Sequence, residues 1–262
     1  MIRSLYTAAT GMKANQTFVD TIAHNLSNVN TIGYKKQQVE FEDLIYQSLQ
    51  RPGGEKEDGN REPVGIEVGL GSRVVAISRV FMQGNLEHTG NATDAAIEGV
   101  GFFQVRMPDG EIGYTRNGAF KINDEGYLTT SQGFLLDPPI NIPHDADFVN
   151  ISSAGEVSAL RHGQTSQDTL GQIELARFIN PSGLFSEGSS IFRQSDASGS
   201  PIIGIPGEEN FGSLRNQFVE SSNVQMVEEM VNMIVAQRAY EISSKAITTS
   251  DEMLQTANNL KR

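Results

Sequence analysis

Acidic side chains come closest to a catalytic pattern in this sequence. Paired carboxylates carry out acid–base chemistry in glycoside hydrolases, where one protonates the leaving group and the other acts as base or nucleophile. Half of the candidates here stand in turn sequences, where an Asp side chain bonds the nearby backbone. We therefore interpret them as solvated residues, with Asp94 as a structural residue that bonds the neighbouring backbone. The candidates are Asp94, Glu98, Asp109, Glu111, Asp124 and Glu125.

Other chemical patterns are weaker. The chain has no Cys, and its four His have neither HxxxH nor HExxH spacing, which leaves no thiol nucleophile and no zinc signature. No Ser lies in a GxSxG sequence, and Gly69–Gly71 and Gly99–Gly101 fit turns rather than phosphate loops. His24 lies in a helical pattern and is interpreted as an interface polar group. The sequence predicts no enzymatic activity, no catalytic residue, no metal, no cofactor and no small-molecule substrate.

Composition and charge exclude further classes of function. The chain has 262 residues, a net charge of −12 and a sequence pI near 4.8, which disfavours nucleic acid as a partner. Its longest apolar runs have four residues, whereas a membrane-spanning helix needs about 20. The N-terminal residues contain no apolar h-region, so we expect no cleaved signal peptide.

Helix-breaking residues are concentrated in the middle of the chain. All nine Pro lie between Pro52 and Pro206, and of 26 Gly only two precede residue 51 and none follows Gly212. Residues 1–50 have no net charge and residues 213–262 carry −1, so −11 lies between them. The two ends are therefore suited to long helices, and the middle to turns, strands and solvent.

Both ends carry apolar residues at alternating spacings of four and three, the signature of a helix seam. The first helix is expected from about residue 2 to 28 and the second from about 223 to 260, with residues 221–223 as N-cap candidates. The predicted self-assembly seam consists of Leu5, Ala9, Met12, Val19 and Leu26 in the first helix, and Met226, Met230, Met233, Ile234, Tyr240, Ile247 and Leu254 in the second.

Two interpretations of these stripes remain open. The helices could pair as one coiled-coil hairpin on a globular body and close an ordinary monomer. The stripes are wider than a two-helix seam needs, however, so they could also be buried against other copies. Head-to-tail contacts between identical copies produce rings or open helical filaments.

The middle of the chain is predicted to be mainly antiparallel β. Short apolar runs alternate with turn sequences at residues 108–110, 117–118 and 124–126, and Asn117-Gly118 is a strong hairpin signal. Residues 51–67 are polar and rich in Pro and Gly, which indicates a flexible or extended arm. The predicted fold class is α+β, with long terminal helices paired as a coiled coil around a central β domain.

Several segments resemble the rod and hook proteins of the bacterial flagellum. Residues 22–34 resemble the N-terminal signature of that family, and residues 230–241 and 250–254 resemble its C-terminal motif. Residues 83–86, 94–103 and 114–120 also match. The start, the length and residues 63–71 are most similar to distal-rod members. The motif positions carried over are Asn25, Leu26, Asn28, Thr31, Gly33, Tyr34, Gln237, Arg238 and Tyr240.

This resemblance implies a structural subunit that polymerises into a hollow rigid shaft, which transmits torque and conducts export across the periplasm. Implied partners are further copies of the chain, proximal rod proteins, the hook protein, the surrounding L and P ring proteins and the export apparatus. The implied domains are residues 1–34, a linking segment and arm at 35–70, the β domain at 71–212 and the C-terminal helix at 213–262. Alternatives are a proximal rod or other axial protein, a non-polymerising binding or assembly module, and an enzyme such as a wall hydrolase.

Overall fold

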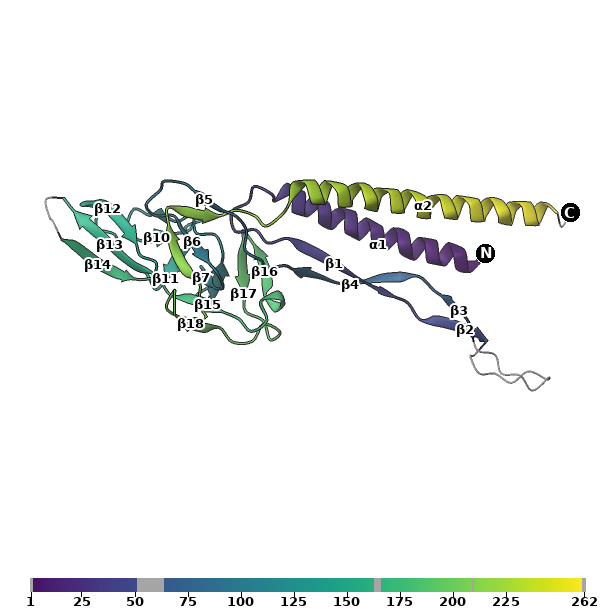
Figure 1. Cartoon of the computed structure of the whole chain (residues 1–262), viewed down its shortest axis with the longest axis horizontal. Helices are drawn as coiled ribbons and strands as arrows, with labels where there is room; N and C mark the ends of the chain where they lie inside the picture. Colours follow the sequence, from purple (N-terminus) through teal and green to yellow (C-terminus); the bar gives the residue numbers. More distant parts are fainter. Residues whose placement is uncertain (1, 51–63, 163–165, 209, 261–262) are drawn as a thin grey trace. The chain divides into compact units, whose positions relative to one another are not determined.

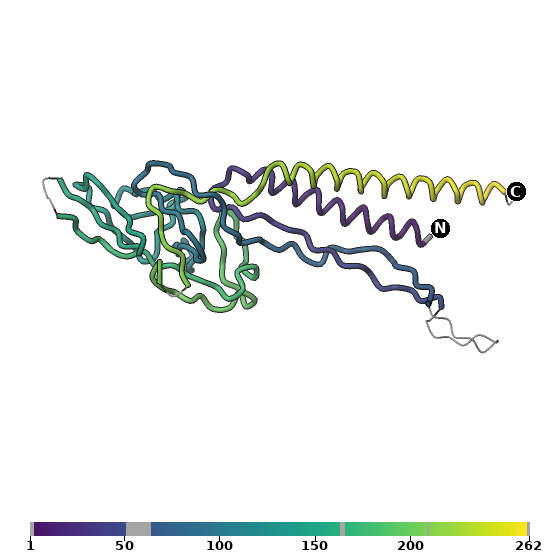
Figure 2. The backbone as a smooth tube through the Cα atoms, in the orientation of Figure 1, coloured from purple at the N-terminus to yellow at the C-terminus, as the bar shows by residue number. Residues whose placement is uncertain are grey.

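A computed structural model describes residues 2–50, 64–162, 166–208 and 210–260, and the chain divides into two compact units (Figures 1 and 2). The helical unit comprises residues 1–27, 37–78 and 225–262. The β unit comprises residues 28–36 and 79–224. The arrangement is α+β, with helices from the two chain ends and mainly antiparallel strands between them, as expected. No helix within the described residues is long and apolar enough to cross a membrane.

Two long helices form the first layer of the helical unit. α1 spans Ile2–Ser27 and α2 spans Met226–Asn259, and they lie side by side in opposite directions (Figure 1). The N-cap prediction at residues 221–223 is wrong, because the N-cap residue is Gln225 and it makes no side-chain cap bond. Asn223 instead uses its side-chain oxygen to accept a hydrogen bond from the Lys36 backbone N–H at 2.7 Å.

A β ribbon forms the second layer of the helical unit and packs on α1. Strands β1 (Gln37–Asp43) and β4 (Ser72–Arg79) pair, and β2 (Tyr46–Gln50) pairs antiparallel with β3 (Ile66–Gly69). The ribbon contacts α1 through an edge-to-face pair of Phe18 and Phe41, with ring centroids 5.7 Å apart. The expected arm is thus a hairpin at its base, and its residues 51–63 lie outside the described part of the chain.

The β unit is built around a nine-stranded antiparallel sheet. Its path runs β16-β17-β8-β7-β11-β10-β9, and β15 joins β7 to β18. A three-stranded sheet β12-β13-β14 and the pairs β19-β6 and β20-β5 complete the unit. The strand bounds are β5 Leu86–His88, β6 Ala95–Glu98, β7 Phe102–Arg106, β8 Ile112–Thr115, β9 Lys121–Ile122, β10 Leu128–Thr129, β11 Leu135–Asp137, β12 Ala146–Ile151, β13 Glu156–Arg161, β14 Gln167–Gln172, β15 Leu175–Arg177, β16 Phe185–Gly188, β17 Ile191–Arg193, β18 Ile202–Gly204, β19 Ser213–Asn216 and β20 Phe218–Glu220, with a 3₁₀ turn at Pro181–Gly183.

Turn chemistry explains part of this topology. Residues 108–110 close the β7–β8 hairpin, where the Gly110 N–H donates to the Met107 carbonyl at 3.0 Å, and residues 124–126 close β9–β10, as expected. The hairpin predicted at Asn117-Gly118 is wrong, because β8 and β9 do not pair with each other. Gly118 is required for close packing instead: a Cβ there would lie 1.6 Å from the Ala95 carbonyl oxygen.

The main apolar core lies in the β unit, where inward-facing residues of the large sheet meet those of the three-stranded sheet. Fully buried members include Phe103, Phe120, Leu128, Ile173 and Leu175. A second cluster is aromatic and includes Phe102, Tyr114 and Phe192. These side chains supply the hydrophobic stabilisation of the β unit, because burial of apolar area is the dominant favourable contribution to folding.

Candidate assembly surface and buried charge cluster

The N-terminal half of α2 presents a row of apolar side chains to solvent. Val227 is 75% exposed, and Ile234 and Val235 are 58% and 59% exposed. Met226, Met230 and Val231 are each about half exposed. We call these six residues the apolar face of α2. Exposed apolar surface is characteristic of interaction sites, which makes this face the candidate assembly surface.

The side of α2 that meets α1 is different in character, because one row of it consists of small and polar residues. Glu229, Ala236 and Ser250 are buried, and together with Ser243 they recur every seven residues. Ser250 Oγ lies 3.4 Å from Ser4 Oγ, and a Cβ added at Gly11 would lie 3.5 Å from Ser243 Oγ. Small side chains let the two helix backbones approach closely, since little volume separates them.

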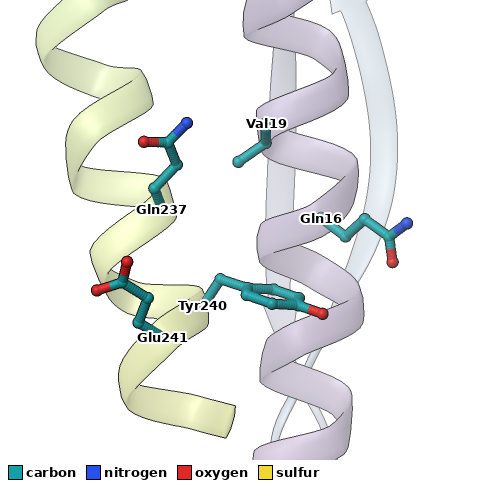
Figure 3. Close-up of a pocket in the computed structure, with 5 residues that line it drawn as sticks. All are labelled: Gln16, Val19, Gln237, Tyr240 and Glu241. Carbon is teal, nitrogen blue, oxygen red and sulfur yellow. The ribbon is translucent and has the colours of Figure 1, made fainter.

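A groove runs between the two helices midway along the pair. It has a cavity volume of about 390 Å³ and is lined by Gln16 and Val19 of α1 and by Gln237, Tyr240 and Glu241 of α2. Figure 3 shows the Tyr240 ring extending from α2 towards α1. The Arg238 guanidinium bonds the Glu241 carboxylate at 2.9 Å one turn along the helix, with both side chains exposed.

The predicted seam residues are divided between the contact and the surface. Half-buried positions are Leu5, Met12, Val19, Leu26, Met233, Ile247 and Leu254, and exposed positions are Ala9, Met226, Met230, Ile234 and Tyr240. Of the C-terminal motif residues, Gln237 and Arg238 are also exposed. Of these motif residues, Gln237 and Tyr240 thus lie at the groove between the helices, and Arg238 lies on the exposed surface of α2.

The N-terminal motif residues are buried or half-buried, and Asn25 is the first of them. Asn25 is 1% exposed and its side-chain amide bonds both backbone groups of Gln37: Nδ2 donates to the carbonyl at 2.8 Å and Oδ1 accepts the N–H at 2.9 Å. Nδ2 also donates to Glu229 Oε2 at 3.1 Å. One amide thereby ties the end of α1 to the start of β1 and to the first turn of α2.

Residues 28–34 of the motif form a compact turn within the β unit. The Thr31 N–H donates to the Asn28 carbonyl at 3.1 Å, and the Tyr34 N–H donates to the Thr31 carbonyl at 3.2 Å. Gly33 has a φ of +69°, and a Cβ there would lie 2.6 Å from the Asn117 nitrogen. Only Gly fits this position without strain, because it combines a left-handed backbone with close backbone packing.

A buried charge cluster that the sequence interpretation missed lies beside this turn. Glu220 is fully buried, and one of its carboxylate oxygens accepts from Lys35 Nζ at 2.6 Å and from the Gly84 N–H at 2.8 Å. Its other oxygen accepts from Arg116 Nε at 2.8 Å. Lys35 is 1% exposed and Arg116 is 4% exposed. We call Lys35, Arg116 and Glu220 the charge cluster.

Backbone carbonyls compensate the second positive charge of the cluster. Lys35 Nζ also donates to the Met82 carbonyl at 2.7 Å, and Arg116 Nη1 donates to the carbonyls of Gly99 and Gly101 at 2.9 and 2.7 Å. Burial lowers the pKa of the Lys35 ammonium despite the attraction of Glu220, and the charge of Arg116 lowers it further. A buried charge is tolerated only when it is paired and hydrogen-bonded, and each member here meets that condition.

Three of the six acidic candidates have structural partners. Asp94 is buried and Oδ2 accepts from Thr89 Oγ1 at 2.7 Å and from Asn91 Nδ2 at 3.1 Å, so it bonds side chains and not the backbone that we expected. Asp109 and Glu111 pair with Arg193 and are exposed. Glu98, Asp124 and Glu125 are exposed as well, and no acidic or His group within the described residues has the geometry to hold a metal ion.

Comparisons with known proteins place the chain in a class. Residues 5–35 match the family described as flagella basal body rod protein. Residues 96–159 match the flagellar hook protein FlgE/F/G D1 domain, and residues 215–260 match the flagellar basal body rod FlgEFG protein C-terminal family. These matches define the class as axial proteins of the flagellum, and they include the buried turn, the sheet and α2.

Full-length relatives narrow the class to one family. The chain is 52% identical over 264 residues to the flagellar basal-body rod protein FlgG of Borreliella burgdorferi, with all of both chains covered. It is 42% identical to FlgG of Caulobacter vibrioides over 99% of this chain and all of the relative, and 39% identical to FlgG of Bacillus subtilis with both chains fully covered. The chain therefore belongs to the FlgG family of flagellar basal-body rod proteins, which are structural proteins and not enzymes.

Proposed function

We propose that this chain is the subunit of the distal flagellar rod and polymerises helically into a hollow, rigid drive shaft. The observation that carries the proposal is the apolar face of α2, which α1 leaves uncovered. Its six residues lie within ten consecutive positions, so the surface is continuous along nearly three helical turns. Burial of that surface against identical copies would supply the driving force for assembly.

The terminal helices would pair as a coiled coil that lines the inner wall of the shaft. The seven-residue spacing of Glu229, Ala236, Ser243 and Ser250 supports a regular helix–helix contact, because heptad spacing keeps one face of a helix towards its partner. The predicted seam residues that lie outside this contact, Met226, Met230 and Ile234, would meet neighbouring subunits. The motif residues Gln237, Arg238 and Tyr240 would lie at the same interfaces.

The sequence divides into four functional segments in this proposal: the first helix and its cap at 1–34, the linking segment and arm at 35–70, the β domain at 71–212 and the C-terminal helix at 213–262. The arm at 47–68 would run between neighbouring subunits and stiffen the shaft. Tyr46 and Leu49 in β2 are more than half exposed, and a two-stranded ribbon is only marginally stable alone. Contacts with a neighbouring subunit would stabilise it.

Assembly implies a set of partners and a place in the cell. The shaft would cross the periplasm, join proximal rod proteins at one end and the hook protein at the other, and turn inside the L and P ring proteins. The subunit would leave the cell through the flagellar export apparatus, and the finished shaft would conduct later exports. The middle of the chain, with its charge of −11, would face outward.

A pair of matched substitutions tests this proposal. Ile234→Asp places a charge in the apolar face of α2, and Ile179→Asp makes the same change at a position of the β unit that is 84% exposed. We expect Ile234→Asp to abolish polymer formation in sedimentation assays and to prevent swimming, with the β unit still folded by NMR. Ile179→Asp should polymerise normally. Normal polymerisation of Ile234→Asp would contradict the proposed interface.

The alternative functions make different predictions. A proximal rod or other axial protein of the family would polymerise but would occupy a different position in purified basal bodies, which labelling of the subunit distinguishes. A non-polymerising assembly module would remain monomeric at high concentration even when seeded with rod fragments. The described residues give little support to the acid–base chemistry of a wall hydrolase, because Asp109 and Glu111 pair with Arg193 and Asp94 bonds Thr89 and Asn91. The other three acidic candidates are simply exposed.

A further inference from the structure

The chain passes between the helical unit and the β unit four times. These crossings lie at residues 27/28, 36/37, 78/79 and 224/225. On the side of the β unit, the four crossings lead into three segments. Residues 28–36 carry two of the crossings, and residues 79–84 and 220–224 carry one each. These segments are therefore the only covalent route by which force can pass from one unit to the other.

Hydrogen bonds join the three segments directly. The Gly33 N–H donates to the Glu220 carbonyl at 2.8 Å, and the Val80 N–H donates to the Lys36 carbonyl at 2.9 Å. Asn223 closes the set, because its Oδ1 accepts the Lys36 N–H at 2.7 Å and its Nδ2 donates to the Val80 carbonyl at 2.8 Å. Every segment thus bonds both of the others, close to the point where it leaves the β unit.

The side chain of Glu220 joins the same segments a second time. It belongs to residues 220–224, binds Lys35 of residues 28–36, and accepts the Gly84 N–H of residues 79–84. Its bond to Arg116 fixes all three to the large sheet, because Arg116 directly follows β8 and bonds the carbonyls that flank Val100. Since the carboxylate is fully buried, water cannot replace these partners, and the low local dielectric strengthens each bond.

We propose that Glu220 is the hub of a mechanical clamp that holds the four exit points of the β unit at fixed separations. The clamp rests on the proposed function, because a drive shaft passes torque through each subunit and the covalent path between the units is confined to these segments. A paired and fully bonded charge cluster suits this role, because sliding one segment past another would strand a buried charge.

Amide hydrogen exchange on the purified full-length chain tests the clamp without any polymer. Glu220→Gln should accelerate exchange by at least about tenfold at the amides of Gly33, Val80 and Gly84 together, while amides paired between β7 and β8 keep their rates. Acceleration at Gly84 alone, or an equal acceleration throughout the β unit, would overturn the hub role of Glu220.

A second variant decides the question if Glu220→Gln does not fold. Lys35→Met leaves Glu220 paired with Arg116, so the sheet keeps a neutral buried pair. It should accelerate exchange at Gly33 and Val80 by about tenfold and spare β7 and β8. Unchanged rates at Gly33 and Val80 would overturn the clamp. Arg106→Gln is the matched control, because Arg106 pairs with Asp137 at the surface of the same sheet at 2.6 Å and should leave all of these rates unchanged.

A swimming assay under load tests the mechanical role of the clamp independently of the proposed function. Cells whose only copy carries Lys35→Met should build rods, but should lose swimming speed or break their shafts in viscous medium, where Arg106→Gln cells do not. Equal performance of the two variants at every viscosity would overturn the mechanical role and leave the rod assignment intact. Absence of the wild-type chain from purified rods would instead overturn the proposed function.

Discussion

The side-chain amide of Asn25 bonds the backbone of Gln37 in the way that one peptide group bonds another. Both distances, 2.8 and 2.9 Å, are those of good hydrogen bonds, and the amide is almost completely buried. An Asn in this position closes residues 26–36 into a loop whose ends are held by a single side chain. The motif residue therefore has a structural role that does not depend on any partner.

Replacement of Asn25 by Ala should destabilise the helical unit by about 3 kcal/mol, because it removes two bonds to half-buried backbone groups and one buried bond to a carboxylate oxygen. Urea unfolding followed by helical circular dichroism measures the change. Asn15→Ala is the matched control, since the Asn15 side-chain amide donates to the Gly11 carbonyl of its own helix, and its replacement should change stability by less than about 1 kcal/mol. Equal effects of the two substitutions would show that the Asn25 bonds contribute little.

Two glycines with left-handed backbones separate the cost of conformation from the cost of close packing. Gly33 has a φ of +69° and the Asn117 backbone next to it, whereas Gly133 has a φ of +89° and no atom within 4 Å of the place that a Cβ would occupy. Ala at either site should cost about 1–2 kcal/mol for the backbone conformation. At Gly33 the clash should add about 1–3 kcal/mol. Thermal unfolding of both variants checks the difference, and similar losses would contradict the packing argument.

The buried ammonium of Lys35 should make stability depend on alkaline pH. Burial lowers the pKa of Lys35 in the folded state, whereas the pKa of a Lys in an unfolded chain is about 10.4. Between these two values the unfolded state binds more protons than the folded state, so the contribution of Lys35 to stability rises with pH. Below the folded-state pKa both states are protonated and the full cost of burying the charge remains.

Lys35→Met provides the reference for this titration, because Met cannot ionise. The stability of the wild type relative to Lys35→Met should increase between pH 7 and pH 10, as measured by urea midpoints at several pH values. Titrations outside the charge cluster are common to both proteins and cancel. A difference that stays constant or falls as the pH rises would contradict a lowered Lys35 pKa in the folded chain.

Periodicity and turn chemistry were sufficient to predict the element types. The spacing of apolar residues predicted both terminal helices, and the Pro-Asp-Gly and Asp-Glu-Gly sequences predicted two hairpins, because these signals are local. The hairpin prediction at Asn117-Gly118 was wrong because Gly118 is needed for close packing against Ala95, which no local pattern reveals. The predicted N-cap failed for a similar reason, since Asn223 bonds Lys36, which lies 187 residues away in the chain.

The charge cluster could not be predicted from the sequence at all. A single Lys or Glu in a sequence indicates an exposed residue, since such residues are almost never fully buried unless paired. Lys35 and Glu220 are separated by 185 residues, so only the folded chain brings them together. The helix contact was also missed in part, because apolar periodicity gives weight to large side chains and passes over Ser4, Gly11, Ser243 and Ser250. A heptad search for small residues would have found it.

Gly11 provides the test of that close helix contact. Gly costs about 1 kcal/mol relative to Ala inside a helix, and a Cβ at this position would lie 3.5 Å from Ser243 Oγ, an ordinary contact distance. Gly11→Ala should therefore stabilise the helical unit by about 0.5–1 kcal/mol. Gly11→Leu should destabilise it by about 1–3 kcal/mol, because the larger side chain forces the helices apart. Helical circular dichroism during thermal unfolding measures both changes. Stabilisation by Leu as well as by Ala would mean that the helices do not pack closely at this position in solution.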